Sequence, residues 1–459
     1  MCGVFFSCSS NPRVLAELRA NYPKSIATLE RRGPDRSIRV DGSDYIIAHT
    51  LLSITGYREQ PIVRDGFEFS FNGEIYNDYL NYGDEYSDTD VLTAHFEEFG
   101  GTEFDRIDGE YAIIWHDRNA RQVVLATDPM GTKPLYYQLG SDHFAAGTYE
   151  STVRECGQKG DIVLVPPNTR LVFDVKDFTV VEKTEIRAFH FDRANVDSYQ
   201  AWTEAFQQAL EKRCRNTRYD QFVCLSSGHD SGLIAAEMAN LKLPFQAYSV
   251  YEGEDRDVLD QRLEWLRARG FLCDVLDPTS EQSFAMHNQL LETLDPFYFE
   301  NPLNPEVTFP NPDFRYNGGI VAHGLIFEKT AARKQIISIA GSGGDEIYAD
   351  FDNPYQNPDW SEIKGQWDKV TGPWKNFNGG WLTIFLGGIE RVAASFSLEG
   401  RYPFLDPDVV QAFLDLSPAL KSRESKAPIS NRMRELEFPM HDRKFGFRGV
   451  DFKLQQASQ

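Results

Sequence analysis

The chain has 459 residues, of which 41% are hydrophobic and 25% are charged, and its formal net charge at pH 7 is -22. The length predicts two domains, each able to bury a core. The negative charge argues against nucleic-acid and anionic-membrane partners, because phosphate groups would be repelled. No apolar run reaches about 18 residues, the length of a membrane span, and the chain does not open on a basic stretch followed by an apolar one. The six cysteines are scattered without metal-like spacing, which is typical of a reducing cytosol, so we expect a soluble cytoplasmic protein.

The first part of the chain, to about residue 185, alternates short β-patterned runs with turn signals. Two helical patterns interrupt these runs. Strands are predicted at 44–54, 67–72, 110–116, 123–127 and 170–174, and helices at 14–31 and 89–99.

From residue 197 the pattern changes to long helical stretches between short apolar strands, at 222–225, 245–250 and 336–339. Strands that alternate with helices indicate parallel βαβ units. We therefore predict one domain at 2–190 and a second, α/β domain at 197–455.

Cys2 directly follows the initiator methionine. Excision of that methionine, which is usual before a small residue, would leave a thiol and a free α-amino group on one residue. An α-amine with a pKa of about 8 can take the thiol proton, so nucleophile and base would lie within a single residue. The alternative is an early buried thiol ahead of a strand.

Five segments rich in Gly, Asn and Asp follow this cysteine. Each alone is typical of a turn or a strand edge, but their order and spacing behind an N-terminal cysteine indicate one site. The segments are Arg-Gly-Pro-Asp at 32–35, Phe-Asn-Gly-Glu-Ile-Tyr-Asn at 71–77, Ser-Asp-Thr-Asp at 87–90, Asp-Gly-Glu-Tyr-Ala at 108–112 and Asp-Pro-Met-Gly-Thr-Lys-Pro-Leu-Tyr at 128–136.

Together these segments resemble the class II glutamine amidotransferase domain, an α+β N-terminal-nucleophile hydrolase with an αββα sandwich. The resemblance implies that Cys2 attacks the side-chain amide of L-glutamine, releasing ammonia and leaving a glutamyl thioester. It places Asn72 and the N–H of Gly73 at the tetrahedral oxyanion, which needs preorganised donors. It also places Glu74 and Asp88 at the α-amino group of glutamine.

One position departs from this family. An arginine shortly after a histidine usually holds the α-carboxylate of glutamine, and here Leu51 stands in its place after His49. Leucine cannot replace a bidentate guanidinium–carboxylate contact. Three alternatives follow: Arg58 or Arg36 supplies the charge, glutamine binds weakly, or the amide donor lacks a free α-carboxylate.

The strand predicted at 222–225 runs into a loop of small residues at 226–232 and then into a helical pattern. Such a loop presents backbone N–H groups and a helix dipole to an anion. It is not a Walker loop, because the chain has no GxxxxGK[ST] motif. It resembles instead the Ser-Gly-Gly-x-Asp-Ser pyrophosphate loop of adenylating ATP pyrophosphatases, with Ser227 in place of the first glycine.

A second loop at 340–346 follows the strand at 336–339, and segments 398–406 and 443–447 come later. In this order they resemble the synthetase domain of asparagine synthetase and its relatives, which include β-lactam synthetases and lasso-peptide cyclases. The resemblance implies an α/β parallel-sheet ATP-pyrophosphatase domain. It assigns Mg²⁺ ligation, which carboxylates and phosphates share, to Asp230 and Asp345, and the α-phosphate to Lys444. The ATP contacts that it implies are Ser226, Ser227, Gly228, Asp230, Ser231, Val250 and Gly343.

A second departure lies in this later loop. Asparagine synthetases carry a glutamate where this chain has Ser342, at the place where the carboxylate substrate meets ammonia. Loss of that acid removes a proton acceptor and changes the charge of the pocket. Free aspartate is therefore less favoured as the acceptor.

We thus predict a carbon–nitrogen ligase of the type found in amino-acid biosynthesis. It would use glutamine and Mg-ATP to amidate a small carboxylate through an acyl-adenylate, giving an amide, AMP, pyrophosphate and glutamate. The alternatives are a specialised acceptor such as a uronic acid, intramolecular amide formation, and a silent nucleotide-binding scaffold. Leu51 and Ser342 favour the scaffold. The residues that favour catalysis are Cys2, Asp230, Asp345 and Lys444. The relatives make a homodimer the expected assembly.

Overall fold

The computed structural model describes residues 1–302, 306, 312–348 and 366–441. The chain divides into two compact units. The first comprises Met1–Ala188 together with Arg215–Arg218, and the second comprises Phe189–Cys214 and the described residues from Tyr219 onward. Among the described residues, no helix has the length and apolar character needed to cross a bilayer.

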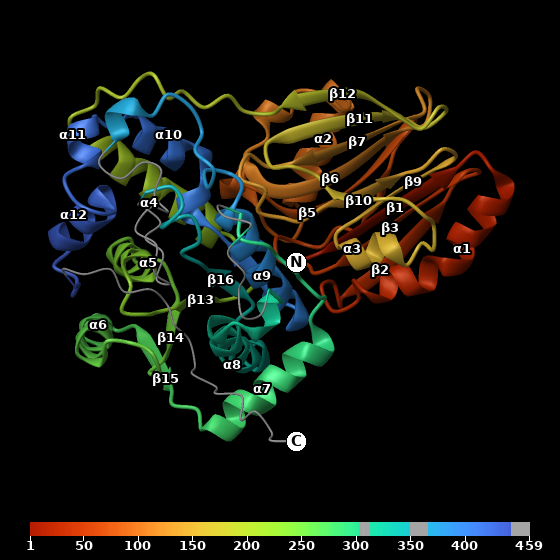
Figure 1. The fold of residues 1–459 in the computed structure, drawn as a ribbon. Coiled ribbons are helices and arrows are strands. Elements are labelled where there is room, and N and C mark those ends of the chain that lie inside the picture. The colour runs from red at the N-terminus through yellow and green to blue at the C-terminus, as the bar shows by residue number, and fades with distance from the viewer. Residues whose placement is uncertain (303–305, 307–311, 349–365, 442–459) are drawn as a thin grey trace. The chain divides into compact units, whose positions relative to one another are not determined.

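The first unit is built on two antiparallel six-stranded sheets. Its strands are β1 (Gly3–Ser9), β2 (Arg36–Asp41), β3 (Tyr45–Leu51), β4 (Ile62–Val63), β5 (Phe67–Ile75), β6 (Gly109–Asp117), β7 (Gln122–Thr127), β8 (Tyr136–Leu139), β9 (His143–Gly147), β10 (Ile162–Leu164), β11 (Thr169–Asp174) and β12 (Thr179–Glu185). One sheet has the order β10-β8-β9-β1-β3-β2 and the other the order β12-β11-β7-β6-β5-β4. Helices α1 (Pro12–Ala27) and α3 (Glu150–Arg154) pack on the first sheet, and α2 (Asp88–Phe99) packs on the second (Figure 1). The predicted αββα sandwich is confirmed.

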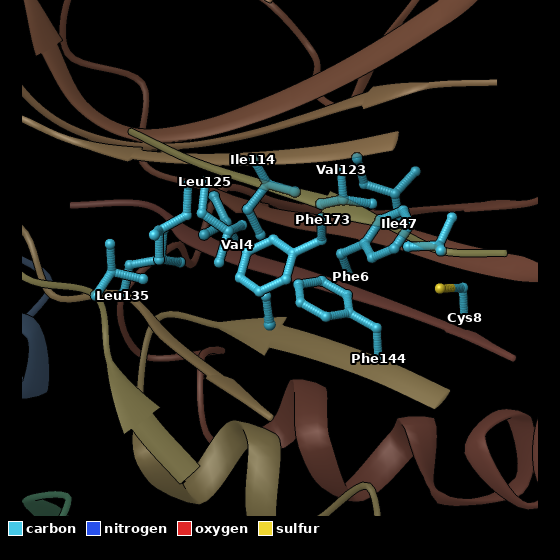
Figure 2. Packing of buried hydrophobic residues seen from close by; sticks show 14 of the residues in the cluster. Val4, Phe6, Cys8, Ile47, Ile114, Val123, Leu125, Leu135, Phe144 and Phe173 are labelled. Atoms are coloured by element: carbon cyan, nitrogen blue, oxygen red, sulfur yellow. The ribbon is translucent and has the colours of Figure 1, made fainter. Parts of the chain in front are cut away.

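The core of this unit lies between the two sheets. Successive side chains of a strand point to opposite faces, so Val4, Phe6 and Cys8 of β1 all turn inward (Figure 2). There they meet Phe144 of β9 and Phe173 of β11, whose ring centroids lie 4.7 Å apart. Burial raises the pKa of the Cys8 thiol far above its ordinary value, so Cys8 packs as a small hydrophobic side chain.

The second unit contains a five-stranded parallel sheet, as the alternation of strands and helices predicts. Its strands are β13 (Gln221–Cys224), β14 (Gln246–Val250), β15 (Leu272–Leu276), β16 (Ile337–Ile339) and β17 (Glu399–Arg401). They are ordered β15-β14-β13-β16-β17, and every neighbouring pair is parallel. The chain therefore leaves β13 toward one edge and later returns to its other side at β16. This reversal creates a switch point at the carboxyl ends of β13 and β16, where sheets of this type bind ligands.

Helices cover this sheet. They are α4 (Gln200–Cys214), α5 (His229–Asn240), α6 (Arg256–Arg267), α7 (Ser280–Thr293), α8 (Gly318–Ala332), α9 (Trp381–Ser395), α10 (Pro407–Asp415), α11 (Pro418–Lys421) and α12 (Ala427–Glu435). Helices α5 and α8 both pack on β13, from opposite faces of the sheet (Figure 1). Helix α5 contacts α4, α6 and α12, whereas α8 contacts α7 and α9.

Two candidate active sites

Cys2 lies immediately before β1 and is buried. The backbone N–H of Leu52 donates to its Sγ at 3.4 Å, and Sγ lies 3.7 Å from the carbonyl oxygen of Leu52. An N–H that donates to sulfur stabilises negative charge there. The buried guanidinium of Arg32 donates from Nε to the carbonyl oxygen of Cys2 at 2.8 Å and from Nη1 to the hydroxyl of Tyr149 at 2.5 Å. The backbone at the thiol is thereby fixed.

Met1 lies against Arg32, the residue that also contacts the backbone of Cys2. It is fully buried, and its sulfur accepts from Nη2 of Arg32 at 3.4 Å. With Met1 present, the nitrogen of Cys2 is a peptide N–H and cannot accept a proton. The amine chemistry expected of Cys2 therefore needs Met1 to be removed.

Asn72 and Gly73 lie next to each other on β5. Asn72 is fully buried, and neither the oxygen nor the nitrogen of its side chain has a hydrogen-bond partner among the described residues. An unpaired buried amide costs about 1–3 kcal/mol, so its retention calls for a functional explanation. Gly73 has φ +133°, and a Cβ added there would lie 1.8 Å from the carbonyl oxygen of Glu110. Only glycine fits beside the unpaired amide.

The carboxylates of Glu74 and Asp88 lie near the same phenol. Glu74 is the second-last residue of β5 and accepts from the hydroxyl of Thr55 at 2.5 Å. Asp88 opens α2 and accepts the N–H of Thr89 at 2.7 Å. Burial raises the pKa of Tyr82, and the charges of Asp88 and Glu74 raise it further. The two carboxylates therefore create a negative region that suits an ammonium group.

Leu51 is the buried last residue of β3 and is paired with Arg36 across to β2. The two arginines expected to compensate for it have other partners. Arg36 is exposed and lies 3.4 Å from a carboxylate oxygen of Glu59. Arg58 lies 2.8 Å from Asp90, and its other nitrogens donate to backbone carbonyls. Neither guanidinium is free to meet a substrate carboxylate.

In the second unit, the loop after β13 folds onto itself. The N–H of Ser226 donates to Oγ of Ser231 at 3.0 Å, and the N–H of Gly228 donates to Oγ of Ser226 at 3.1 Å. Helix α5 begins directly after Gly228, with Asp230 in its first turn. The loop thus leads directly into the N-terminus of a helix, a position that favours negative charge.

The loop after β16 packs directly against this first turn of α5. A Cβ added to Gly344 would lie 2.3 Å from Oδ1 of Asp230, and one added to Gly341 would lie 2.8 Å from Cβ of the same residue. Gly343 has φ +94°, and a Cβ there would lie 2.3 Å from Leu405. Glycine therefore allows the two loops to meet at the switch point of the sheet.

Lys426 links the two loops. Its Nζ lies 2.6 Å from both carboxylate oxygens of Asp230 and 2.9 Å from Oδ1 of Asp345, and its side chain is 5% exposed. Burial alone would lower the pKa of Lys426, but the charges of Asp230 and Asp345 raise it well above the ordinary value. The lysine also adopts the left-handed conformation, with φ 53°, at the start of α12. The raised pKa keeps Lys426 charged at neutral pH, and the start of α12 places this charge between the two carboxylates.

Two further carboxylates border this site. Glu346 accepts the N–H of Gly343 at 3.0 Å, and burial together with the charge of Asp345 raises the pKa of Glu346 to about 7. Glu254, which follows β14, accepts the N–H of Ser227 at 2.6 Å and also its hydroxyl. Burial raises the pKa of Glu254. A side-chain anion thus binds to an N–H group of the predicted phosphate loop.

Comparison with known proteins relates the chain to one family. Residues 1–163 match the family model described as "Glutamine amidotransferase domain". A protein of Schizosaccharomyces pombe named "Probable asparagine synthetase [glutamine-hydrolyzing]" is 24% identical over 457 residues, which cover 92% of this chain and 77% of that protein. Asparagine synthetase B of Escherichia coli is 27% identical over 259 residues, 51% of this chain and 44% of that protein. Residues 1–163 are thus similar to a glutamine amidotransferase domain, and most of the chain is similar to glutamine-hydrolysing asparagine synthetases. We accordingly call the first unit the amidotransferase unit and the second the synthetase unit.

The structure assembles the predicted residues of the synthetase unit around Asp230. Ser226, Gly228 and Ser231 form one loop, and Asp345 meets Asp230 through Lys426. Val250 is buried at the carboxyl end of β14, and Ser342 is half-buried in the loop after β16. Lys444 lies outside the described residues.

Sequence reasoning missed Lys426, which is 196 residues from Asp230. The available signal was Pro428, because proline near the start of a helix marks its N-terminus. That signal places Lys426 at a helix start but does not say what lies opposite it.

The donor set at this site fits Mg²⁺. Asp230 and Asp345 both present carboxylate oxygens to one cationic group, and Mg²⁺ is typically held by one or two carboxylates together with phosphate oxygens and water. Among the described residues, no group of three or more His, Cys, Asp or Glu side chains could hold a metal ion. A bound Mg²⁺ would therefore complete its shell with water or with oxygens of a nucleotide.

Proposed function

We propose that the protein converts a carboxylate to an amide through an acyl-adenylate, using glutamine as nitrogen donor and ATP as activating agent. The observation that carries the proposal is the unpaired, fully buried amide of Asn72 next to Gly73. It supports an oxyanion site in the unit that contains Cys2. In the synthetase unit, the paired carboxylates of Asp230 and Asp345 at the phosphate loop support nucleotide activation.

In the amidotransferase unit, the free amine of Cys2 would take the thiol proton. The sulfur then attacks the amide carbon of glutamine, and the carbonyl oxygen becomes an oxyanion that Asn72 and the N–H of Gly73 stabilise. The carbon–nitrogen bond breaks, and the nitrogen leaves as ammonia with the proton held by the amine. Water hydrolyses the thioester to glutamate. Glu74 and Asp88 would hold the α-ammonium group during these steps.

In the synthetase unit, a carboxylate oxygen of the acceptor would attack the α-phosphorus of ATP, and the bond to pyrophosphate would break. Bound Mg²⁺ would neutralise charge on the phosphates. Lys426 would donate to phosphate oxygens once nucleotide enters, and Lys444 would contact the α-phosphate. Ammonia then attacks the acyl carbon, the bond to AMP breaks, and an amide forms.

Glu346, in the loop after β16, is a candidate proton acceptor for this last step. Its pKa of about 7 means that a part of the molecules carry the deprotonated carboxylate at neutral pH. A group with such a pKa can accept the proton that ammonia loses as the amide forms. This assignment gives the loop an acid although Ser342 replaces the family's glutamate.

The experiment mixes the protein and Mg-ATP with hydroxylamine and a panel of carboxylic acids, then searches for a hydroxamate by mass spectrometry. We expect one acid to give a hydroxamate together with AMP and pyrophosphate. If no acid does so, the synthetase assignment is wrong. In Cys2→Ala, ammonium-supported amide formation should persist while glutamine-supported formation is lost.

The finer properties follow from the same proposal. Mg²⁺ dependence is tested by titrating the metal back into chelated enzyme. All six cysteines are free thiols, which supports a cytoplasmic location. The expected homodimer stays a prediction that sedimentation equilibrium would test.

A further inference from the structure

The amidotransferase unit needs a cation for the α-carboxylate of glutamine, and its first-choice groups cannot supply one. Leu51 carries no charge. Burial lowers the pKa of His49 to about 3, so this imidazole is neutral. Arg36 and Arg58 are paired with carboxylates, and the nitrogens of Arg32 donate to the backbone and side chains around Cys2.

A different arginine reaches the unit from far along the chain. Residues 215–218 belong to the amidotransferase unit although they lie between α4 and β13 of the synthetase unit. The backbone N–H of Arg218 donates to the carbonyl oxygen of Ile54 at 3.1 Å, and its Nη1 donates to Oγ of Ser53 at 3.1 Å. The side-chain amide of Asn216 donates to two backbone carbonyls of the same unit at 3.0 Å. The segment is therefore anchored by its backbone and by a neighbouring side chain.

The guanidinium of Arg218 has N–H donors that remain available for a substrate. Guanidinium carries five N–H donors, and in the described part of the chain its one side-chain partner is the hydroxyl of Ser53. Arg218 forms no ion pair with a described carboxylate. The residue is exposed, so a small substrate can reach it.

Because the guanidinium of Arg218 is bound to Ser53, the position of Ser53 places it relative to Cys2 and Glu74. The four residues 52–55 follow β3 in sequence: Leu52 contacts the Cys2 thiol, Ser53 contacts Arg218, and Thr55 contacts Glu74. The nucleophile, the free guanidinium and a carboxylate expected at the α-ammonium group thus all touch one short segment.

The spacing agrees with the head group of an amino acid. Two residues of chain span at most about 7 Å, which limits the separation of the Ser53 and Thr55 backbones. Groups that hold the ammonium and the carboxylate of one α-carbon lie about 9 Å apart, that is, about 3 Å across the head group plus two charged hydrogen bonds of about 2.8 Å. A cation bound to Ser53 and an anion bound to Thr55 extend from backbones within this limit, so their charged groups can reach that separation.

We propose that Arg218 binds the α-carboxylate of glutamine and replaces the arginine that Leu51 lacks. This inference rests on the proposed function, because it assigns a substrate group to the same site. It makes the amidotransferase site depend on a residue that lies outside residues 1–188.

The test is steady-state kinetics of glutamate and ammonia release by the full chain with Met1 removed. Arg218→Ala should raise the KM for glutamine about 10- to 100-fold, because a charged hydrogen bond is lost, and should leave kcat within about twofold. Arg218→Lys should show an intermediate KM. The same alanine change at Arg36 or Arg58 should alter KM less than about threefold.

A second substrate separates charge recognition from structural damage. L-Glutaminamide carries a neutral amide in place of the α-carboxylate, so Arg218→Ala should hydrolyse it with the same KM as the wild type. In the wild type, the KM for glutaminamide should exceed the KM for glutamine. The ratio should be about the factor by which Arg218→Ala raises the KM for glutamine. This preference is measurable even if the alanine variant fails to fold.

Distinct results reject the two proposals. If the wild type hydrolyses glutamine and Arg218→Ala has an unchanged KM, or if the wild type uses both substrates equally well, the assignment of Arg218 is overturned. If the wild type with a free Cys2 amine releases no ammonia from glutamine, the glutaminase function itself is overturned. A rise in KM in Arg36→Ala or Arg58→Ala alone moves the role to that residue.

Discussion

Replacing Lys426 with methionine removes the cation that separates Asp230 and Asp345 while keeping the length of the side chain. Both carboxylates lie within 2.9 Å of Nζ, so the variant leaves them facing each other. Breaking a buried ion pair by removing one partner costs about 3–5 kcal/mol. The two aspartate side chains are 20% and 26% exposed, and water will soften the repulsion. We therefore expect the free energy of unfolding of the synthetase unit to fall by about 3 kcal/mol.

Mg²⁺ should restore most of this loss, because the same carboxylates are its expected ligands. A ligand at 100 times its Kd that binds only the folded state adds about 2.7 kcal/mol. The assay is urea unfolding followed by tryptophan fluorescence, with chelator or with increasing Mg²⁺. Of the tryptophans that the structure describes, all except Trp115 belong to the synthetase unit, so the signal reports mainly on that unit.

Lys329→Met is the matched control. Lys329 lies 2.9 Å from Asp274 but is 34% exposed, so its loss should cost less than about 1 kcal/mol and should not respond to Mg²⁺. The reasoning is refuted if Lys426→Met is no less stable than this control. It is also refuted if Mg²⁺ stabilises Lys426→Met no more than the wild type.

Three other changes test other parts of the molecule. Asn72→Ala should lower kcat for glutamine hydrolysis about 10²- to 10³-fold without lowering the free energy of unfolding, because the amide has no partner to lose; a stability loss above about 1 kcal/mol would contradict this. Glu254→Gln should lower the KM for ATP, because it removes an anion bound to the phosphate loop, and an unchanged or higher KM would argue against such competition. Burial alone would raise the pKa of Asp406, but Lys212 at 2.6 Å and Arg213 at 2.7 Å hold it well below its usual value. Stability from this carboxylate is present above about pH 4 and is lost as the pH falls below it, so the destabilisation caused by Asp406→Asn should be largest near pH 7 and shrink toward pH 2; a pH-independent difference would show that charge is not its source.

The sequence predicts elements best where burial imposes a pattern. Strands β5, β6 and β7 carry apolar side chains into a core, and each was predicted within a few residues of its ends. Strand β12 was not predicted, because all of its residues are exposed and it sits at the edge of its sheet. An exposed edge strand is free to be charged, so its sequence carries no alternation of apolar and polar residues.

In the candidate sites, residues that are contiguous in the sequence could be predicted, whereas residues brought together by the fold could not. The loop before α5 was predictable because strand, loop and helix are contiguous in the sequence. Lys426 and Arg218 were not, because their partners lie 196 and 165 residues away and no local pattern records such a contact. A missing charge, as at Leu51, was visible in the sequence, whereas its replacement required the fold.

The burial of Met1 has a consequence for how active copies arise. A methionine aminopeptidase needs an accessible chain end, and in the folded unit Met1 is fully buried next to Arg32. Excision therefore has to precede folding or to follow local opening of this chain end. A copy that keeps Met1 has no free amine at Cys2. The fraction of active protein in a preparation then depends on the fraction of chains that have lost Met1. Mass spectrometry of the N-terminus would measure that fraction.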